Sequence, residues 1–185
     1  VVQHIDAPYF QRASRFHFPQ WLLATMVFSG LWKDDFINQV QMVAYYHRWT
    51  DTDRGGKFMF WRDNGEDPVV IPPTSRSANS VDGSLMVHSA EIYMPERLPF
   101  PFSPTAINQL KYQKEDDKWD IIVDGEKKSE VANDDIRYTA VYRARCFRNK
   151  AERDKYHEDQ KNPWTLAEIM GKFEADLEKR GLWSK

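Results

Sequence analysis

The sequence has little of what marks several classes of protein. Cys146 is the only cysteine among 185 residues, which excludes an internal disulfide and a cysteine-based zinc cluster. The formal net charge is −2, so the chain offers no basic field for nucleic acid. No apolar run approaches the roughly 20 residues needed to cross a bilayer, and the run at 21–28 follows no basic signal-peptide start. We therefore expect an intracellular, cytoplasmic protein without a membrane or nucleic-acid partner; its oligomeric state is left open.

Most of the chain consists of short segments with the pattern of β-strands. Alternating or β-branched runs predict strands at residues 1–6, 39–49, 57–61, 84–93 and 136–147. Asp124-Gly125 separates two further runs, 119–123 and 127–131, and this dipeptide is a strong hairpin signal. The proline-rich segments 63–80 and 94–104 are predicted to be loops. The sequence thus predicts one mostly β domain with flanking helices.

Two segments are predicted to be helices. Pro19 and Gly30 bound an apolar run rich in Leu, Ala and Met. A final helix is expected to begin at Asn162-Pro163 and to end at Gly181. Its apolar stripe consists of Leu166, Ile169, Met170, Phe173 and Leu177. We expect this stripe to pack on the outer face of a sheet, because an amphipathic helix buries its apolar side.

The first ten residues, VVQHIDAPYF, carry the clearest chemical signal. His4 and Asp6 are two residues apart in an expected strand, so their side chains point to one face. Together they supply two-thirds of a 2-His-1-carboxylate iron site. His88 lies in a later expected strand, and the chain between holds enough strand to go round a small barrel and return. The sequence therefore predicts that His4, Asp6 and His88 converge.

The last expected strand carries a group that suits a carboxylate. Arg137 and Thr139 are two residues apart, which places a guanidinium and a hydroxyl on one strand face. An arginine fork binds both oxygens of a carboxylate, so this pair predicts a pocket for the far carboxylate of a keto acid. Arg143, six positions after Arg137, has the same facing. The alternative is a surface strand whose arginines are simply solvated.

In this order, the H-x-D, the later strand histidine and the Arg-x-Thr resemble the iron(II)- and 2-oxoglutarate-dependent oxygenase superfamily. The phrases HIDAPYF, PQWLLATMVFSG, VDGSLMVHSAEIY and RYTAVYRARCF resemble uncharacterised members of it. The resemblance implies a double-stranded β-helix (a jelly-roll or cupin-like barrel) whose usual amino-terminal strands are expected to lie outside this sequence. It also implies that His4, Asp6 and His88 bind iron(II). Arg137 would bind 2-oxoglutarate, with Thr139 hydrogen-bonding beside it.

The activity implied by the resemblance is that of a dioxygenase. Such an enzyme uses O₂ and 2-oxoglutarate, releases succinate and CO₂, and hydroxylates a substrate, here unidentified. Arg143, Gln41 and Tyr45 are expected to contact this substrate, and the spacing of Arg143 from Arg137 resembles the nucleic-acid-dealkylating branch. The interval from His88 to Arg137 is longer than is usual in the family, so we expect a hairpin insertion near 111–131. The oxygenase core would then span 1–147, with 148–185 as a helical extension packed on it.

Two other functions fit part of the pattern. A catalytically inactive barrel could serve as a binding or scaffold module, although such a barrel need not retain the complete set of site residues. A cupin-like metal isomerase or dioxygenase would need further histidine or glutamate ligands to its metal, and Glu91 or His47 would have to be that ligand. His47 and Asp51 form a rival metal site of their own, whose alternative is a strand end followed by a solvated loop.

Overall fold

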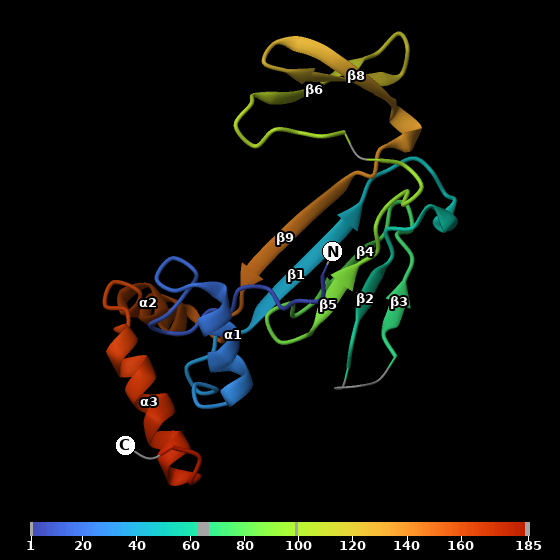
Figure 1. The fold of residues 1–185 in the computed structure, drawn as a ribbon. Helices are drawn as coiled ribbons and strands as arrows, with labels where there is room; N and C mark the ends of the chain where they lie inside the picture. Colours follow the sequence, from blue (N-terminus) through green and yellow to red (C-terminus); the bar gives the residue numbers. More distant parts are fainter. Residues whose placement is uncertain (1, 63–66, 99, 184–185) are drawn as a thin grey trace. The chain divides into compact units, whose positions relative to one another are not determined.

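A computed structural model of the chain describes residues 2–62, 67–98 and 100–183 (Figure 1). The strands are β1 (Gln39–Tyr45), β2 (Phe58–Phe60), β3 (Val69–Ile71), β4 (Ala78–Val81), β5 (His88–Ala90), β6 (Asn108–Gln113), β7 (Lys118–Val123), β8 (Glu126–Ala132) and β9 (Thr139–Arg145). The helices are α1 (Gln20–Ser29), α2 (Lys150–Asp159) and α3 (Leu166–Lys179), with 3-10 turns η1 (Thr52–Arg54) and η2 (Asn133–Asp135). The prediction of a mostly β chain with a few helices is confirmed.

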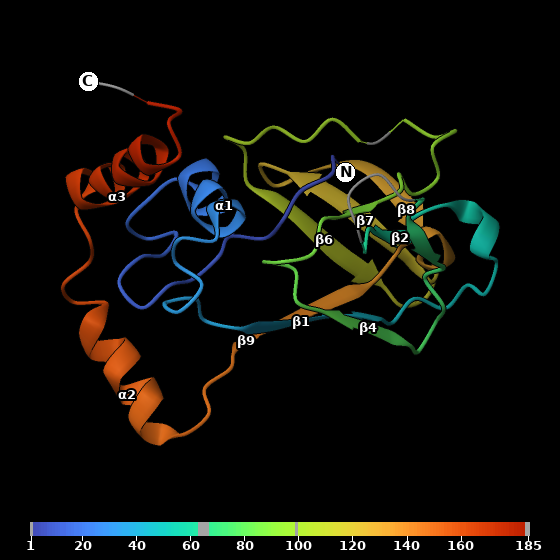
Figure 2. The same ribbon diagram turned by 90° about the horizontal axis from the view of Figure 1, so that it is seen from below.

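The strands form three small sheets, ordered β4-β1-β9, β3-β2-β5 and β6-β7-β8 (Figures 1 and 2). In the third sheet, Asp124 and Gly125 have φ values of 51° and 84°. Positive φ at both central residues is the condition for a two-residue hairpin turn whose twist matches its strands. The hairpin predicted at this dipeptide is therefore present, and β6 joins it by pairing with β7.

The chain divides into two compact units. The first comprises Val1–Gln3, Met42–Ser80 and His88–Tyr142, and it holds the sheets β3-β2-β5 and β6-β7-β8. The second comprises His4–Gln41, Val81–Val87 and Arg143–Lys185, and it holds α1, α2 and α3. None of the helices in the described part of the chain is both long and apolar enough to cross a membrane.

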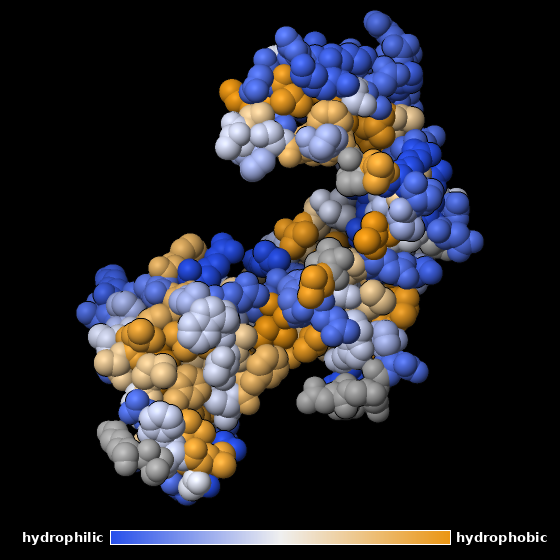
Figure 3. Space-filling view, viewed as in Figure 1, coloured by the Kyte–Doolittle hydropathy of each residue, from blue (hydrophilic) through white to orange (hydrophobic). Residues whose placement is uncertain are grey.

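The core of the second unit lies around α1. This helix begins after Pro19 and ends at Gly30, whose φ of 69° glycine adopts without steric cost. Its buried side chains join a cluster that also includes residues from the segments before and after α1 and from α3: Phe10, Ala13, Leu22, Leu23, Met26, Trp32 and Ile169. Figure 3 shows apolar residues gathered over α1 and α3. Each fully buried large side chain contributes about 1.5–3 kcal/mol of transfer free energy.

Helix α3 differs from its prediction in start and in packing. It begins after Thr165, because the Thr165 side chain and Glu168 form a reciprocal capping box, whereas the expected start was Asn162-Pro163. Ile169 is 1% exposed, and the Phe173 ring meets Trp32 edge-on at 4.9 Å. Ile169 and Phe173 of the stripe thus pack on the cluster around α1, and the expectation that the stripe covers a sheet face is wrong.

Several strand predictions are also wrong. Among the described residues of 1–6, only His4 makes an isolated bridge, and Val1 lies outside the described residues. Strand β3 and all but the last residue of β4 lie in the segment 63–80, which was predicted to be loop; residues 63–66 lie outside the described part. The strand expected from residue 84 begins only at His88, because Asp82 closes a turn by accepting bonds from the Ser84 backbone and hydroxyl.

Candidate metal centre

The three predicted metal ligands meet in the structure. His4, Asp6 and His88 each offer one ligand atom, and these atoms all lie within 4.8 Å of one another. His88 is buried, while His4 and Asp6 are partly buried. Within the described residues, this is the only group of three or more histidine, cysteine or acidic side chains placed to hold a metal. The convergence expected from the sequence is present, even though residues 2–6 do not form a regular strand.

Local hydrogen bonds hold the His4–Asp6 segment in place. The Asp6 backbone N–H donates to the Gly83 carbonyl at 2.7 Å, and the Gln20 side chain donates to the Ile5 carbonyl at 2.6 Å. Ile5, between the two ligands, is buried. Both bonds hold the peptide group that joins Ile5 to Asp6, and they therefore fix the backbone directly before the Asp6 ligand.

The 81–87 segment brings His88 to the same place. Asp82 shapes its turn and also accepts a hydrogen bond from the backbone of Gln39. Gly83, which bonds Asp6, is in this turn, and His88 is the first residue after it and the first of β5. The His88 ring lies 5.7 Å from that of Phe58 on the neighbouring strand β2. The turn that bonds Asp6 therefore also delivers the third ligand.

The donor set fits a divalent transition metal. Two imidazoles and one carboxylate are the ligands of the facial triad of non-haem iron sites, which leaves further positions open. Metal–ligand bonds of about 2.0–2.2 Å would draw the three atoms somewhat closer than the observed limit of 4.8 Å.

Arg143 and Gln41, predicted to contact substrate, are joined to the Asp6 ligand. Arg143 donates through one terminal nitrogen to Asp6 Oδ1 at 3.2 Å and through Nε to the Gln41 side-chain oxygen. A charge-assisted bond of this kind fixes the orientation of a carboxylate. Metal ligands are commonly held by such outer partners. Arg143 is therefore placed to orient Asp6, with part of its side chain exposed.

Arg137 lies over the ring of Tyr45, with its guanidinium carbon 5.3 Å from the ring centroid. Its Nε is buried and has no hydrogen-bond partner in the described part of the chain. Gly56 lies against the same side chain: a Cβ built there would sit 3.5 Å from Arg137 Nε. A buried donor without a partner is costly, and an anionic oxygen is the group that best satisfies an arginine.

Thr139 and Tyr45 differ in their exposure. Thr139 is exposed at the start of β9, and no hydrogen bond joins it to Arg137 within the described residues. Tyr45 is buried beneath Arg137, and its hydroxyl accepts a bond from Asn79 at 3.4 Å. Tyr45 thus supports Arg137, and its expected contact with substrate stays a prediction.

The side chains proposed for rival metal sites have other surroundings. The carboxylate of Glu91 accepts a bond from the Lys57 backbone and lies 4.0 Å from the Lys57 ammonium. His47 is 1% exposed and stacks on Trp49 with ring centroids 3.7 Å apart. Burial lowers the pKa of His47; the Pro73 backbone opposes this shift, and the charge of Arg137 adds to it. His47 is therefore a buried core side chain whose surroundings disfavour the charged imidazolium.

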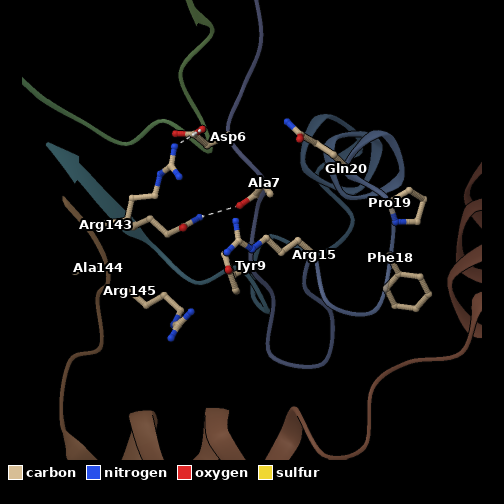
Figure 4. Close-up of a pocket in the computed structure, with 11 residues that line it drawn as sticks. Asp6, Ala7, Tyr9, Arg15, Phe18, Pro19, Gln20, Arg143, Ala144 and Arg145 are labelled. Atoms are coloured by element: carbon tan, nitrogen blue, oxygen red, sulfur yellow. Dashed lines mark hydrogen bonds and ion pairs between the residues drawn. The ribbon is translucent and has the colours of Figure 1, made fainter. Parts of the chain in front are cut away.

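A cavity of about 590 Å³ borders Asp6 (Figure 4). Its lining includes Arg143 and two arginines that were not singled out from the sequence, Arg15 and Arg145. Arg145 follows Arg143 by two residues on β9, so strand parity alone could have placed both on one face. Arg15 carries no comparable signal, because it comes from an irregular segment before α1.

Comparison with known proteins adds no information on the function of this chain. No family model, no curated protein and no solved structure matches this chain.

Proposed function

We propose that the protein is an iron(II)- and 2-oxoglutarate-dependent dioxygenase that hydroxylates a substrate on a double-stranded β-helix core. The observation that carries the proposal is the meeting of His4, Asp6 and His88, which are far apart in the sequence and form a 2-His-1-carboxylate set. The partnerless Nε of Arg137 supports the second half of the proposal, because a keto acid needs a cation for its far carboxylate.

Each residue has a definite task in this proposal. His4, Asp6 and His88 would hold the iron, and Arg143 keeps the Asp6 carboxylate in its ligating orientation through the bond to Oδ1. Arg137 would bind the far carboxylate of 2-oxoglutarate. With both groups bound, the cofactors supply oxidative decarboxylation, which consumes O₂ and yields succinate and CO₂.

Tyr45 and Gly56 shape the surroundings of Arg137. The Tyr45 ring lies against the guanidinium and keeps water from one of its faces. Gly56 has a φ of 73° and no side chain, so the backbone comes close to Arg137 without covering it. The guanidinium is thereby held in one orientation, which lowers the entropic cost of binding a dicarboxylate.

Anaerobic titration tests the proposal without knowledge of the substrate. Protein with Fe(II) and 2-oxoglutarate is expected to develop the weak visible charge-transfer band of the chelate. Arg137→Ala should leave metal binding intact and weaken 2-oxoglutarate about 10- to 150-fold, which corresponds to the 1.5–3 kcal/mol of a hydrogen bond to a charged group. Arg148→Ala is the matched control, since that side chain is 89% exposed and pairs with Glu152.

Two results would count against the proposal. The absence of the band in protein shown by calorimetry to contain Fe(II) would remove 2-oxoglutarate as cosubstrate. An Arg137→Ala variant with the affinity of the parent would show that the far carboxylate binds elsewhere.

A further inference from the structure

The cavity beside Asp6 has the size of a small-molecule site. Its volume of about 590 Å³ lies within the roughly 300–1,000 Å³ of ligand pockets. Figure 4 shows its walls coming from the segment after Asp6, from the start of α1 and from the end of β9. All of these residues belong to the second unit. The cavity therefore reaches a proposed metal ligand from one side.

The cavity wall carries an excess of positive charge. Arg15, Arg143 and Arg145 line it, while Asp6 is the only acidic residue of the lining. The carboxylate of Asp6 already binds Arg143 and is the proposed metal ligand. Neither Arg15 nor Arg145 forms an ion pair within the described residues. Arg12, Arg54 and Arg148, by contrast, each pair with a carboxylate. Two guanidiniums at this cavity thus remain uncompensated.

Aromatic contacts position the free arginines. The guanidinium of Arg145 lies 5.0 Å from the Tyr9 ring and 5.5 Å from the ring of the buried Tyr156. Arg15 lies 5.2 Å from the ring of Phe16. Cation–π contacts hold a guanidinium in place without neutralising it. Both arginines are exposed and carry no ion pair within the described residues, so their charges are open to a ligand.

The N-terminus of α1 adds a smaller, partial positive charge to the cavity wall. Pro19 and Gln20 are part of the cavity wall, and Pro19 caps the helix without a side-chain hydrogen bond. The first N–H groups of a helix carry a partial positive charge that favours anions. Tyr9 and Phe18 supply apolar surface at the same cavity. The wall thus combines cationic groups with aromatic rings.

We propose that this cavity binds the acidic group of a small-molecule substrate, either a carboxylate or a phosphate, and presents the rest of that molecule to the metal centre at Asp6. This inference rests on the proposed function, for which it names the substrate class. The arginine fork matches the paired oxygens of both groups. The cavity volume and its aromatic wall favour a compact acid over a polymer.

Ligand-observed NMR with three probes tests the inference on the full chain. Benzoate and phenyl phosphate should bind, with the stronger probe identifying the preferred acid, while the neutral analogue benzamide should not. Arg145→Gln and Arg15→Gln should each weaken the acids about tenfold or more, since each removes charge-assisted bonds. Arg148→Gln, in the exposed pair with Glu152, should change nothing.

A second arm relates the cavity to the metal. With Mn(II) bound, the resonances of the acids should broaden strongly, because the cavity borders the Asp6 ligand. Equal binding of benzamide, or unchanged affinities in both arginine variants, would overturn the inference. So would binding of a single-stranded oligonucleotide with no binding of the small acids.

The two proposals fail in different ways. Failure of Mn(II) to bind counts against the metal centre, while arginine-dependent binding of the acids still supports the anion site. Acid binding without broadening in Mn(II)-loaded protein would show that the cavity does not serve the metal, and would overturn its assignment to the substrate.

Discussion

Lowering the pH should destabilise the protein through one buried imidazole. His47 is 1% exposed, and neither ring nitrogen makes a hydrogen bond in the described part of the chain. Burial therefore holds the pKa of His47 below its ordinary value of 6.5. One face of the imidazole stacks on Trp49, with ring centroids 3.7 Å apart.

The size of the effect follows from proton linkage. As the pH falls through 6.5, the unfolded chain binds a proton at His47 that the folded chain does not, so the free energy of unfolding falls. The limiting slope is about 1.4 kcal/mol per pH unit for one proton. Between pH 7.5 and 5.5 the loss is then at most about 1.4 kcal/mol, because titration begins only near the midpoint. Carboxylates whose pKa is lowered in the folded protein, such as Asp135 and Glu130, reduce the free energy of unfolding only at lower pH, where they gain protons.

Urea unfolding at several pH values measures this loss. His47→Gln should flatten the dependence between pH 7.5 and 5.5, whatever its effect on absolute stability. His157→Gln is the control, because His157 is exposed on α2. An unchanged pH dependence in His47→Gln would refute the assignment of a neutral buried imidazole.

Two further pairs of variants test the packing by urea unfolding. Ile169→Ala should cost about 2–5 kcal/mol, because it leaves a cavity in the cluster around α1. Met170 is 42% exposed, so Met170→Ala should cost under about 1 kcal/mol. Equal losses of stability in Ile169→Ala and Met170→Ala would contradict the packing of α3. Gly55→Ala should lose more than about 1 kcal/mol, since its Cβ would lie 2.4 Å from the Ile92 carbonyl oxygen. Gly171→Ala should raise the free energy of unfolding by about 0.4–1 kcal/mol, because a Cβ at Gly171 would meet no atom within 4 Å. A stable Gly55→Ala and a destabilised Gly171→Ala would refute both expectations.

Features with strong local signals could be predicted from the sequence. Pro19 and Gly30 bound α1 as expected, because each fixes the backbone at its own position. The hairpin at Asp124-Gly125 likewise depends on a dipeptide that tolerates positive φ. His4, Asp6 and His88 could be named because the H-x-D spacing, followed by a histidine in a later strand segment, is a pattern of sequence alone.

Features that depend on distant partners could not be predicted. Strand β3 has three residues, and its pairing with β2, not its own pattern, defines it. Residues 2–6 have the pattern of a strand, yet Gly83 and Gln20 bind their backbone instead. The cavity beside Asp6 joins Arg15 and Arg145, which are brought together only by the fold.

Metal binding by the parent and by one ligand variant tests the central proposal most directly. Calorimetry with Mn(II) or Co(II) should show one ion per chain for the parent and for His157→Ala. His88→Ala should weaken binding by more than about 100-fold, since loss of groups that merely orient a ligand already costs about 10- to 100-fold. If His88→Ala binds the ion as tightly as the parent, His4, Asp6 and His88 do not form the metal site.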